Sequence, residues 1–138
     1  MNKFWSVTGG ILLLAIALLL VGNSHGGITF SDIETECRYD RTTDYQISLQ
    51  PDNQLHFRGH FPVNSTKADL SYKYSQGSNK IVLNVIARDE KEAPESFRNQ
   101  CLGSVVYDGV TSSLQEGFYD VILKHDGVRV EHQVISIE

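Results

Sequence analysis

The sequence has little positive charge, and its basic residues form no stripe or cluster. It contains 12 Lys and Arg against 17 Asp and Glu, which gives a formal net charge of −5. A negative chain repels phosphate backbones, so the composition argues against nucleic acid as a partner. Hydrophobic residues make up 41% and charged residues 21% of the chain, values that fit a globular protein and argue against disorder.

Sequence motifs that carry chemistry are also missing. No serine stands in a strand–turn–helix nucleophile motif, and no glycine-rich phosphate loop follows a strand. Two cysteines without a nearby histidine pair do not make a closed zinc site, and the acidic stretch 89–95 lacks the spacing of a calcium loop. We therefore expect no catalytic residue, no metal site and no cofactor, and we expect that the protein is not an enzyme.

Amphipathic helices longer than a turn or two are absent after residue 27, and a period-two alternation takes their place. Leu55, Phe57 and Phe61 alternate with polar neighbours, and residues 81–87 repeat the pattern. Turn residues separate such segments, most clearly at Asp126-Gly127, the strongest hairpin signal in the chain. Including the early segment 28–39, the pattern predicts seven or eight short strands in a sandwich or barrel.

The last two strands carry finer signals. Residues 118–123 are almost wholly apolar, which predicts a central strand covered on both faces. In the final strand the apolar phase slips, and a bulge near Val134 would explain the slip. Tyr119 fits either a tyrosine corner, whose hydroxyl ties a strand back to a preceding loop, or a plain core tyrosine. His125 is expected at the hairpin tip beside Asp126.

Residues 1–26 have the layout of an export segment. Lys3 precedes the uninterrupted apolar run 11–21, and a small, polar flank follows that run. This is the layout of a cleaved secretory signal, which leaves residues 27–138 as one domain. The alternative is an uncleaved anchor, because residues 4–21 form an 18-residue hydrophobic segment that is just long enough to span a bilayer. Both readings place the domain outside the cell, at the surface or in the medium.

Two further features fit an exported chain. Cys37 and Cys101 are the only cysteines, and an even count in an oxidising compartment favours a disulfide. Its loop of about 65 residues would add ~4 kcal/mol of stability in the chain-entropy model; two buried free thiols are the alternative. Asn64-Ser65-Thr66 is an N-glycosylation sequon in a polar stretch, so we expect Asn64 on a surface loop.

His56, Arg58 and His60 form the candidate binding surface. They occupy alternate positions and therefore share the polar face of one expected strand. Four residues along a strand span about 13 Å, which is too far for the two imidazoles to bind one metal ion. We interpret the three residues as a solvent-facing polar surface and, with the expected loop 89–99, as a candidate contact for a partner.

Three stretches carry a resemblance to a known group of proteins. They are Phe57-Arg58-Gly59-His60-Phe61-Pro62-Val63, Cys101 with Tyr107 six residues later, and Gly117-Phe118-Tyr119 with His125-Asp126-Gly127. On these residues the segment from Leu55 to Val130 resembles small exported archaeal proteins, mainly of salt-loving species. The resemblance implies an immunoglobulin-like sandwich of unassigned function. Those proteins carry a cysteine shortly after the proline-containing loop, where this chain has Asn64-Ser65-Thr66-Lys67, so a disulfide here would link a different pair of positions.

Together these patterns predict an all-β protein, an immunoglobulin-like antiparallel sandwich of seven or eight strands after an N-terminal hydrophobic helix. The expected function is a non-catalytic exported binding or structural module at the cell surface. Its expected partner is a protein or a cell-envelope component, with contact to the membrane only through an uncleaved N-terminal segment. The alternative is a protein-inhibitor or chaperone-like domain that acts on a protease or a secreted protein, although no reactive-site sequence points to it.

Overall fold

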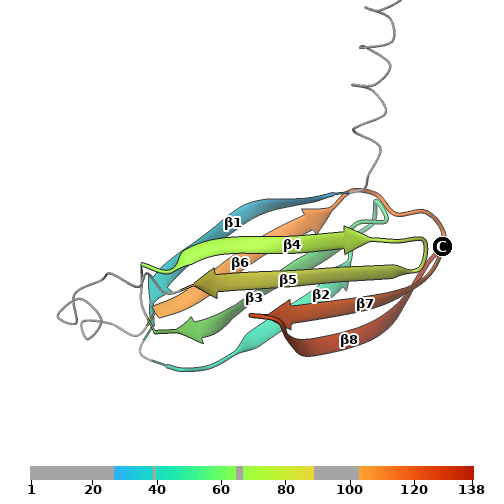
Figure 1. The fold of residues 1–138 in the computed structure, drawn as a ribbon. Coiled ribbons are helices and arrows are strands. Elements are labelled where there is room, and N and C mark those ends of the chain that lie inside the picture. Colours follow the sequence, from blue (N-terminus) through green and yellow to red (C-terminus); the bar gives the residue numbers. More distant parts are fainter. Residues whose placement is uncertain (1–26, 39, 65–66, 89–102) are drawn as a thin grey trace, which may run out of the picture.

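The protein is all-β in the part of the chain that the structure describes (Figure 1). The structure is a computed structural model, and it describes residues 27–38, 40–64, 67–88 and 103–138. These ranges contain eight strands and no helix, which confirms the expected all-β class and strand number. The strands are β1 (Ile28–Cys37), β2 (Asp44–Leu49), β3 (Leu55–Val63), β4 (Asp69–Gln76), β5 (Lys80–Arg88), β6 (Gly103–Thr111), β7 (Gly117–His125) and β8 (Val128–Ile137).

The strands form two four-stranded sheets that pack face to face (Figure 1). Sheet A has the order β1-β6-β3-β2, and sheet B has the order β4-β5-β7-β8. The expectation of a purely antiparallel sandwich is wrong for one pair, because β5 and β7 run parallel. The chain crosses from β5 to β6 in sheet A before it returns to sheet B as β7. A parallel pair requires such a crossover, because a hairpin reverses the chain direction.

The core lies between the sheets and follows the expected alternation. Successive side chains of a strand point to opposite faces, so every second residue enters the core. Burying one such apolar side chain contributes about 1.5–3 kcal/mol. The expected inward faces of residues 55–61 and 81–85 are confirmed. Eight apolar side chains have no exposed surface: Leu55, Phe57, Ile81, Leu83, Val85, Val105, Val121 and Leu123.

Tight turns hold two of the hairpins in register. Asp126 and Gly127 have φ angles of 50° and 80°, as a two-residue type I′ turn requires, and they join β7 to β8 as expected. The Ala87 N–H donates a hydrogen bond of 2.8 Å to Asp126 Oδ1, which ties this turn to the end of β5. Asn53, in the turn between β2 and β3, has a φ of 58°, a conformation that asparagine tolerates.

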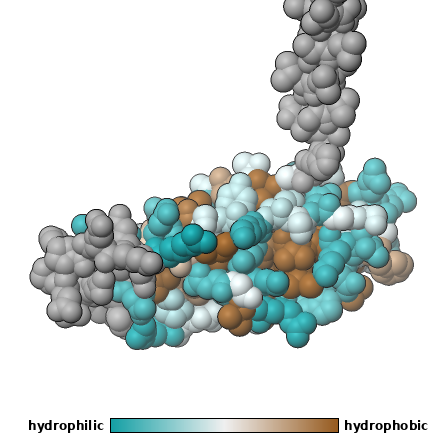
Figure 2. Space-filling view, in the orientation of Figure 1, coloured by the Kyte–Doolittle hydropathy of each residue, from teal (hydrophilic) through white to brown (hydrophobic). Residues whose placement is uncertain are grey.

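The expectation that β7 is covered on both faces is wrong. β7 is central in sheet B, but only its inward face packs against sheet A. Phe118 on the outer face is 70% exposed, whereas Tyr119 on the inward face is 4% exposed. Figure 2 shows this outer face of sheet B, on which hydrophobic residues lie among polar ones. An apolar run therefore identifies the strand without showing how many of its faces are buried.

The bulge of β8 lies at Val130 rather than near Val134. The register shifts between Leu123 and Lys124 of β7, so that Val130 is the extra residue of β8. Pairing is regular beyond this point, and Val134 lies on the outer face, where it is 67% exposed. The extra residue changes the phase of the strand, so that Val130 before the shift and Ile135 and Ile137 after it all pack against the core.

Two of the expected segments lie outside the described residues. They are the expected signal peptide or anchor in residues 1–26, which includes the hydrophobic segment 4–21, and the expected loop 89–99. These expectations stay predictions. Among the residues that the structure describes, no helix has the length and apolar character that crossing a bilayer demands.

Tyr119 makes the contact of a tyrosine corner. Its hydroxyl donates a hydrogen bond of 3.0 Å to the backbone carbonyl of Gln115, while its ring is buried in the core. The side chain therefore ties the start of β7 to the loop that precedes it. Tyr119 is therefore not a plain core tyrosine, because its hydroxyl makes the hydrogen bond expected of a tyrosine corner.

We expect Tyr119→Phe to lower the free energy of unfolding by about 1 kcal/mol, because it removes this hydrogen bond and leaves the packed ring in place. Urea unfolding followed by circular dichroism measures the change. Tyr72→Phe is the matched control, since the Tyr72 side chain is 45% exposed and its hydroxyl bonds to no other described residue. Equal stabilities of the two variants would contradict the structural role of the Tyr119 hydroxyl.

Candidate functional site

The outer face of sheet A carries the expected binding residues. His56, Arg58 and His60 occupy alternate positions of β3 and point away from the core, while Leu55 and Phe57 point into it. The structure thus places the three polar residues on one face, as their spacing indicates. The same face continues over the three other strands of sheet A.

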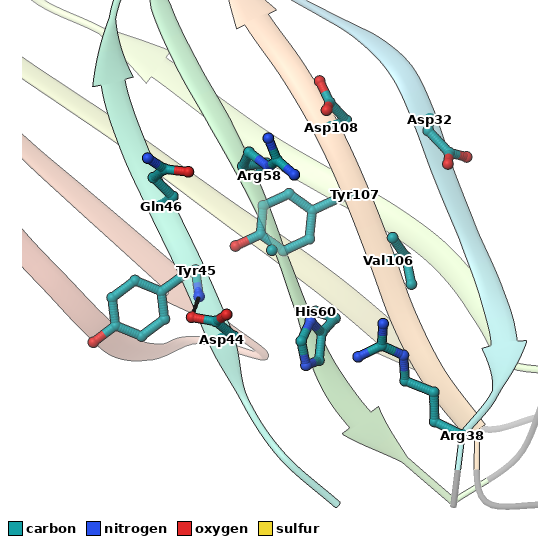
Figure 3. A pocket seen from close by; sticks show the side chains of 11 residues that line it. Asp32, Arg38, Asp44, Tyr45, Gln46, Arg58, His60, Val106, Tyr107 and Asp108 are labelled. Carbon is teal, nitrogen blue, oxygen red and sulfur yellow. Dashed lines mark hydrogen bonds between the residues drawn. The ribbon is translucent and has the colours of Figure 1, made fainter. Parts of the chain in front are cut away.

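Strands β2 and β6 surround Arg58 and His60 with further polar groups. Arg58 lies opposite Gln46 on one side and Asp108 on the other, and His60 lies opposite Asp44. Asp32 of β1 and Arg38, which follows β1, complete a shallow cavity of about 310 Å³, called here the sheet A cavity (Figure 3). Its charged and imidazole side chains are Asp32, Arg38, Asp44, Arg58, His60 and Asp108.

Asp108 is held in place by two neighbours. Its Oδ1 lies 2.6 Å from His56 Nε2 and accepts a hydrogen bond of 3.2 Å from Ser31 Oγ. Both side chains of the His56–Asp108 pair are partly exposed, and such pairs contribute little to stability. The contacts therefore matter mainly because they fix the orientation of the carboxylate.

Arg58 and Arg38 differ in their partners. Arg38 Nε lies 2.7 Å from Glu36 Oε1, which orients its side chain from the end of β1 toward His60 (Figure 3). Arg58 is exposed and takes part in no ion pair with another residue of the described ranges. A guanidinium group carries five N–H donors and no acceptor. Arg58 therefore presents an unused set of donors to the cavity.

Gly59 makes room for a buried polar pair beneath the cavity. A Cβ atom at Gly59 would lie 2.6 Å from the Tyr107 hydroxyl oxygen and 2.6 Å from the Asp44 carbonyl oxygen, so a side chain there would displace the backbone. The Tyr107 hydroxyl is hydrogen bonded to His125 Nε2 at 2.8 Å. Phe61 stacks on the imidazole with 4.3 Å between ring centroids.

Burial shifts the titration of this pair. Removal from water lowers the pKa of His125 to about 4, with a smaller contribution from His60. Removal from water also raises the pKa of the Tyr107 hydroxyl, with help from Asp44 and Tyr45. Both groups are therefore uncharged at neutral pH. His125 Nδ1 has no hydrogen-bond partner among the described groups.

The burial of His125 was missed at the level of sequence. The residue precedes the hairpin tip, as expected, but it is the last residue of β7 and only 6% exposed. A signal was present, because Tyr119, Val121, Leu123 and His125 are spaced by two and share the inward face. Because an imidazole is polar, His125 was not counted among the inward residues of this series.

Cys37 is the last residue of β1 and lies opposite Gly103 at the start of β6. Cys37 is the one cysteine within the described ranges, and it is not a free thiol. Cys101 lies outside these ranges, two positions before Gly103 in the sequence. The disulfide between them stays a prediction.

Asn64 is exposed and follows directly after β3. Its Oδ1 accepts a hydrogen bond of 3.2 Å from Arg41 Nη2. The other sequon residues, Ser65 and Thr66, lie outside the described ranges. The exposed position agrees with the expected surface placement of Asn64, and its glycosylation stays a prediction.

The sheet A cavity is lined mainly by side chains that donate or accept hydrogen bonds. Within the described ranges, no three His, Cys, Asp or Glu side chains are grouped so as to hold a metal ion. Comparison with profiles of known protein families, with curated sequences and with solved structures finds no match. The resemblance to exported archaeal sandwiches therefore stays an expectation, and the functional argument rests on the sheet A cavity.

We expect acid to destabilise the fold through His125, by about 3 kcal/mol between pH 6.5 and pH 4. The unfolded chain restores the ordinary pKa of 6.5, whereas the folded value is about 4, so the unfolded state takes up the proton first and stability falls as the pH falls. Urea titrations at both pH values measure this loss.

The variant His125→Gln should show a smaller loss of stability in acid, because it has no imidazole to protonate. Tyr107→Phe is its control, since it keeps the buried imidazole and should keep most of the acid-induced loss. If His125→Gln lost as much stability as the wild type between the two pH values, His125 would not be the acid-sensitive group.

Intact-mass spectrometry of the protein from its native host tests the covalent predictions. We expect a chain without residues 1–26, lighter by two hydrogens for the Cys37–Cys101 disulfide, and carrying a glycan that Asn64→Gln removes. A full-length mass would favour the uncleaved anchor. Alkylation of both cysteines in denaturant without reductant would contradict the disulfide.

Proposed function

We propose that this protein is a non-catalytic binding module, exported to the cell surface, and that the sheet A cavity is its binding surface. The observation that carries the proposal is the exposed Arg58 guanidinium, which stands in the cavity without an ion-pair partner in the described part of the chain. A ligand with acceptor groups would use donors that the fold leaves open. Arginine is also enriched where proteins recognise partners.

The fixed orientation of the surrounding side chains supports a recognition role. Asp108 is fixed by His56, and Arg38 is fixed by Glu36. The backbone beneath Arg58 is paired with neighbouring strands on both sides. Groups that are ordered before binding lose little entropy when a ligand arrives, so a site of this kind binds with less cost than a loop.

We also infer that the domain belongs to the broad immunoglobulin-like class of sandwiches. The two packed sheets and the bond from the Tyr119 hydroxyl to the Gln115 carbonyl support this inference. The parallel pairing of β5 and β7 departs from the antiparallel sheets of that class. Fold class does not determine function, so the binding proposal does not depend on it.

We expect beads that carry the protein to capture a protein or glycan component from a detergent-solubilised envelope extract of its host. Arg58→Gln should lower the captured amount about tenfold, because hydrogen bonds to a charged group are worth about 1.5–3 kcal/mol. Quantitative mass spectrometry and sugar analysis of the eluates measure the difference.

Arg129→Gln is the matched control for this experiment. Arg129 is an exposed arginine of β8 in sheet B, away from the sheet A cavity, so its removal should leave capture unchanged. Equal capture by Arg58→Gln and Arg129→Gln would contradict the proposed surface. If the wild-type protein captured nothing, the binding function itself would be refuted.

A further inference from the structure

Donor and acceptor side chains lie on neighbouring strands across the sheet A cavity. Arg58 lies opposite Asp108, and Asp108 lies opposite Asp32 on the next strand. Guanidinium groups only donate hydrogen bonds and carboxylates only accept them, whereas a hydroxyl group does both. Neighbouring strands are about 4.8 Å apart, so the cavity offers donor and acceptor positions at short, regular intervals. A ligand with several adjacent hydroxyl groups matches such a series.

The charge of the cavity disfavours an ionic ligand. Three carboxylates and two guanidinium groups line it, and the whole chain carries a net charge of −5. An anion would meet the carboxylates of Asp32 and Asp108, and a cation would meet Arg58. Removing any of these charges from water without a suitable partner is costly. An uncharged polar ligand avoids both conflicts and still satisfies the charged groups through hydrogen bonds.

The floor of the cavity is less polar than its rim. Val106 of β6 lies among the charged side chains (Figure 3) and is partly buried. A half-buried aliphatic side chain gives a ligand's C–H groups a surface to pack against. Polar groups around an aliphatic floor suit a sugar ring, whose edge carries hydroxyl groups and whose face carries C–H groups. The volume of about 310 Å³ lies at the lower end of the range for small-ligand sites.

From these observations, and resting on the proposed binding function, we infer that the sheet A cavity binds an uncharged carbohydrate. Arg58 donates to ring or hydroxyl oxygens, Asp32 accepts from a neighbouring hydroxyl, and Val106 packs against the face of the sugar. The ordered side chains Asp108 and Arg38 complete the rim. Because the cavity is shallow and open to solvent, the affinity for a single sugar unit should be weak and should rise with the length of the oligosaccharide.

The full-length protein tests this inference on an array that carries neutral, sulfated and phosphorylated oligosaccharides, followed by calorimetry with the best neutral oligosaccharide. We expect binding to a subset of the neutral oligosaccharides. Arg58→Gln and Asp32→Asn should each lower the association constant about tenfold, whereas Arg129→Gln should leave it unchanged. Affinity should change less than about twofold between ~0.05 M and ~0.5 M NaCl, because screening acts on charged pairs.

The outcomes separate the ligand class from the binding function. Binding restricted to sulfated or phosphorylated oligosaccharides, with a steep salt dependence, would overturn the uncharged ligand. Capture of an envelope component that depends on Arg58, without binding to any array oligosaccharide, would overturn the carbohydrate and keep the binding function. If Arg58→Gln and Asp32→Asn bound neutral oligosaccharides as tightly as the wild type does, the assignment of binding to the sheet A cavity would be overturned. Loss of both array binding and envelope capture would refute both proposals.

Discussion

Contact between the inward faces of the two sheets is the interaction on which the rest of the structure depends. Each sheet has one apolar face, and the two faces leave water together when the sheets pack. The strands that supply the core also carry the outward side chains, so the core fixes the position of the site. A slip of β3 by one residue would move Phe57 to the surface and Arg58 into the core, a cost that holds the strand in its register.

The core is not wholly apolar where it lies beneath the sheet A cavity. Tyr107 of sheet A and His125 of sheet B form a hydrogen bond across the two layers. A buried polar group is costly unless it is paired, and this pair satisfies one nitrogen of the imidazole and the tyrosine hydroxyl. Gly59 admits the hydroxyl under the strand that carries Arg58 and His60. Tyr107, which lines the cavity, therefore connects the candidate site to the buried imidazole of His125.

The candidate site was only partly predictable. The spacing of His56, Arg58 and His60 places them on one face of a strand, and this required nothing beyond period two. Asp108, by contrast, lies opposite Arg58 on a strand 50 residues further along the sequence, and no local pattern indicates that pairing. The charged neighbours of Arg58 decide what it can bind. They could be identified only from the arrangement of the strands. The apolar phase of β8 predicted a bulge in this strand, but its place at Val130 came only from the pairing with β7.

The sequence by itself determined the all-β class, the inward and outward residues of most strands, and turns such as Asp126-Gly127, because alternation and turn geometry depend on near neighbours. The tertiary structure decided the strand order, the parallel pairing of β5 with β7, the burial of His125 and the neighbours of Arg58. These features depend on which strands pair after the chain crosses between sheets. That choice is made by packing across the whole domain, and no short segment of the sequence contains it.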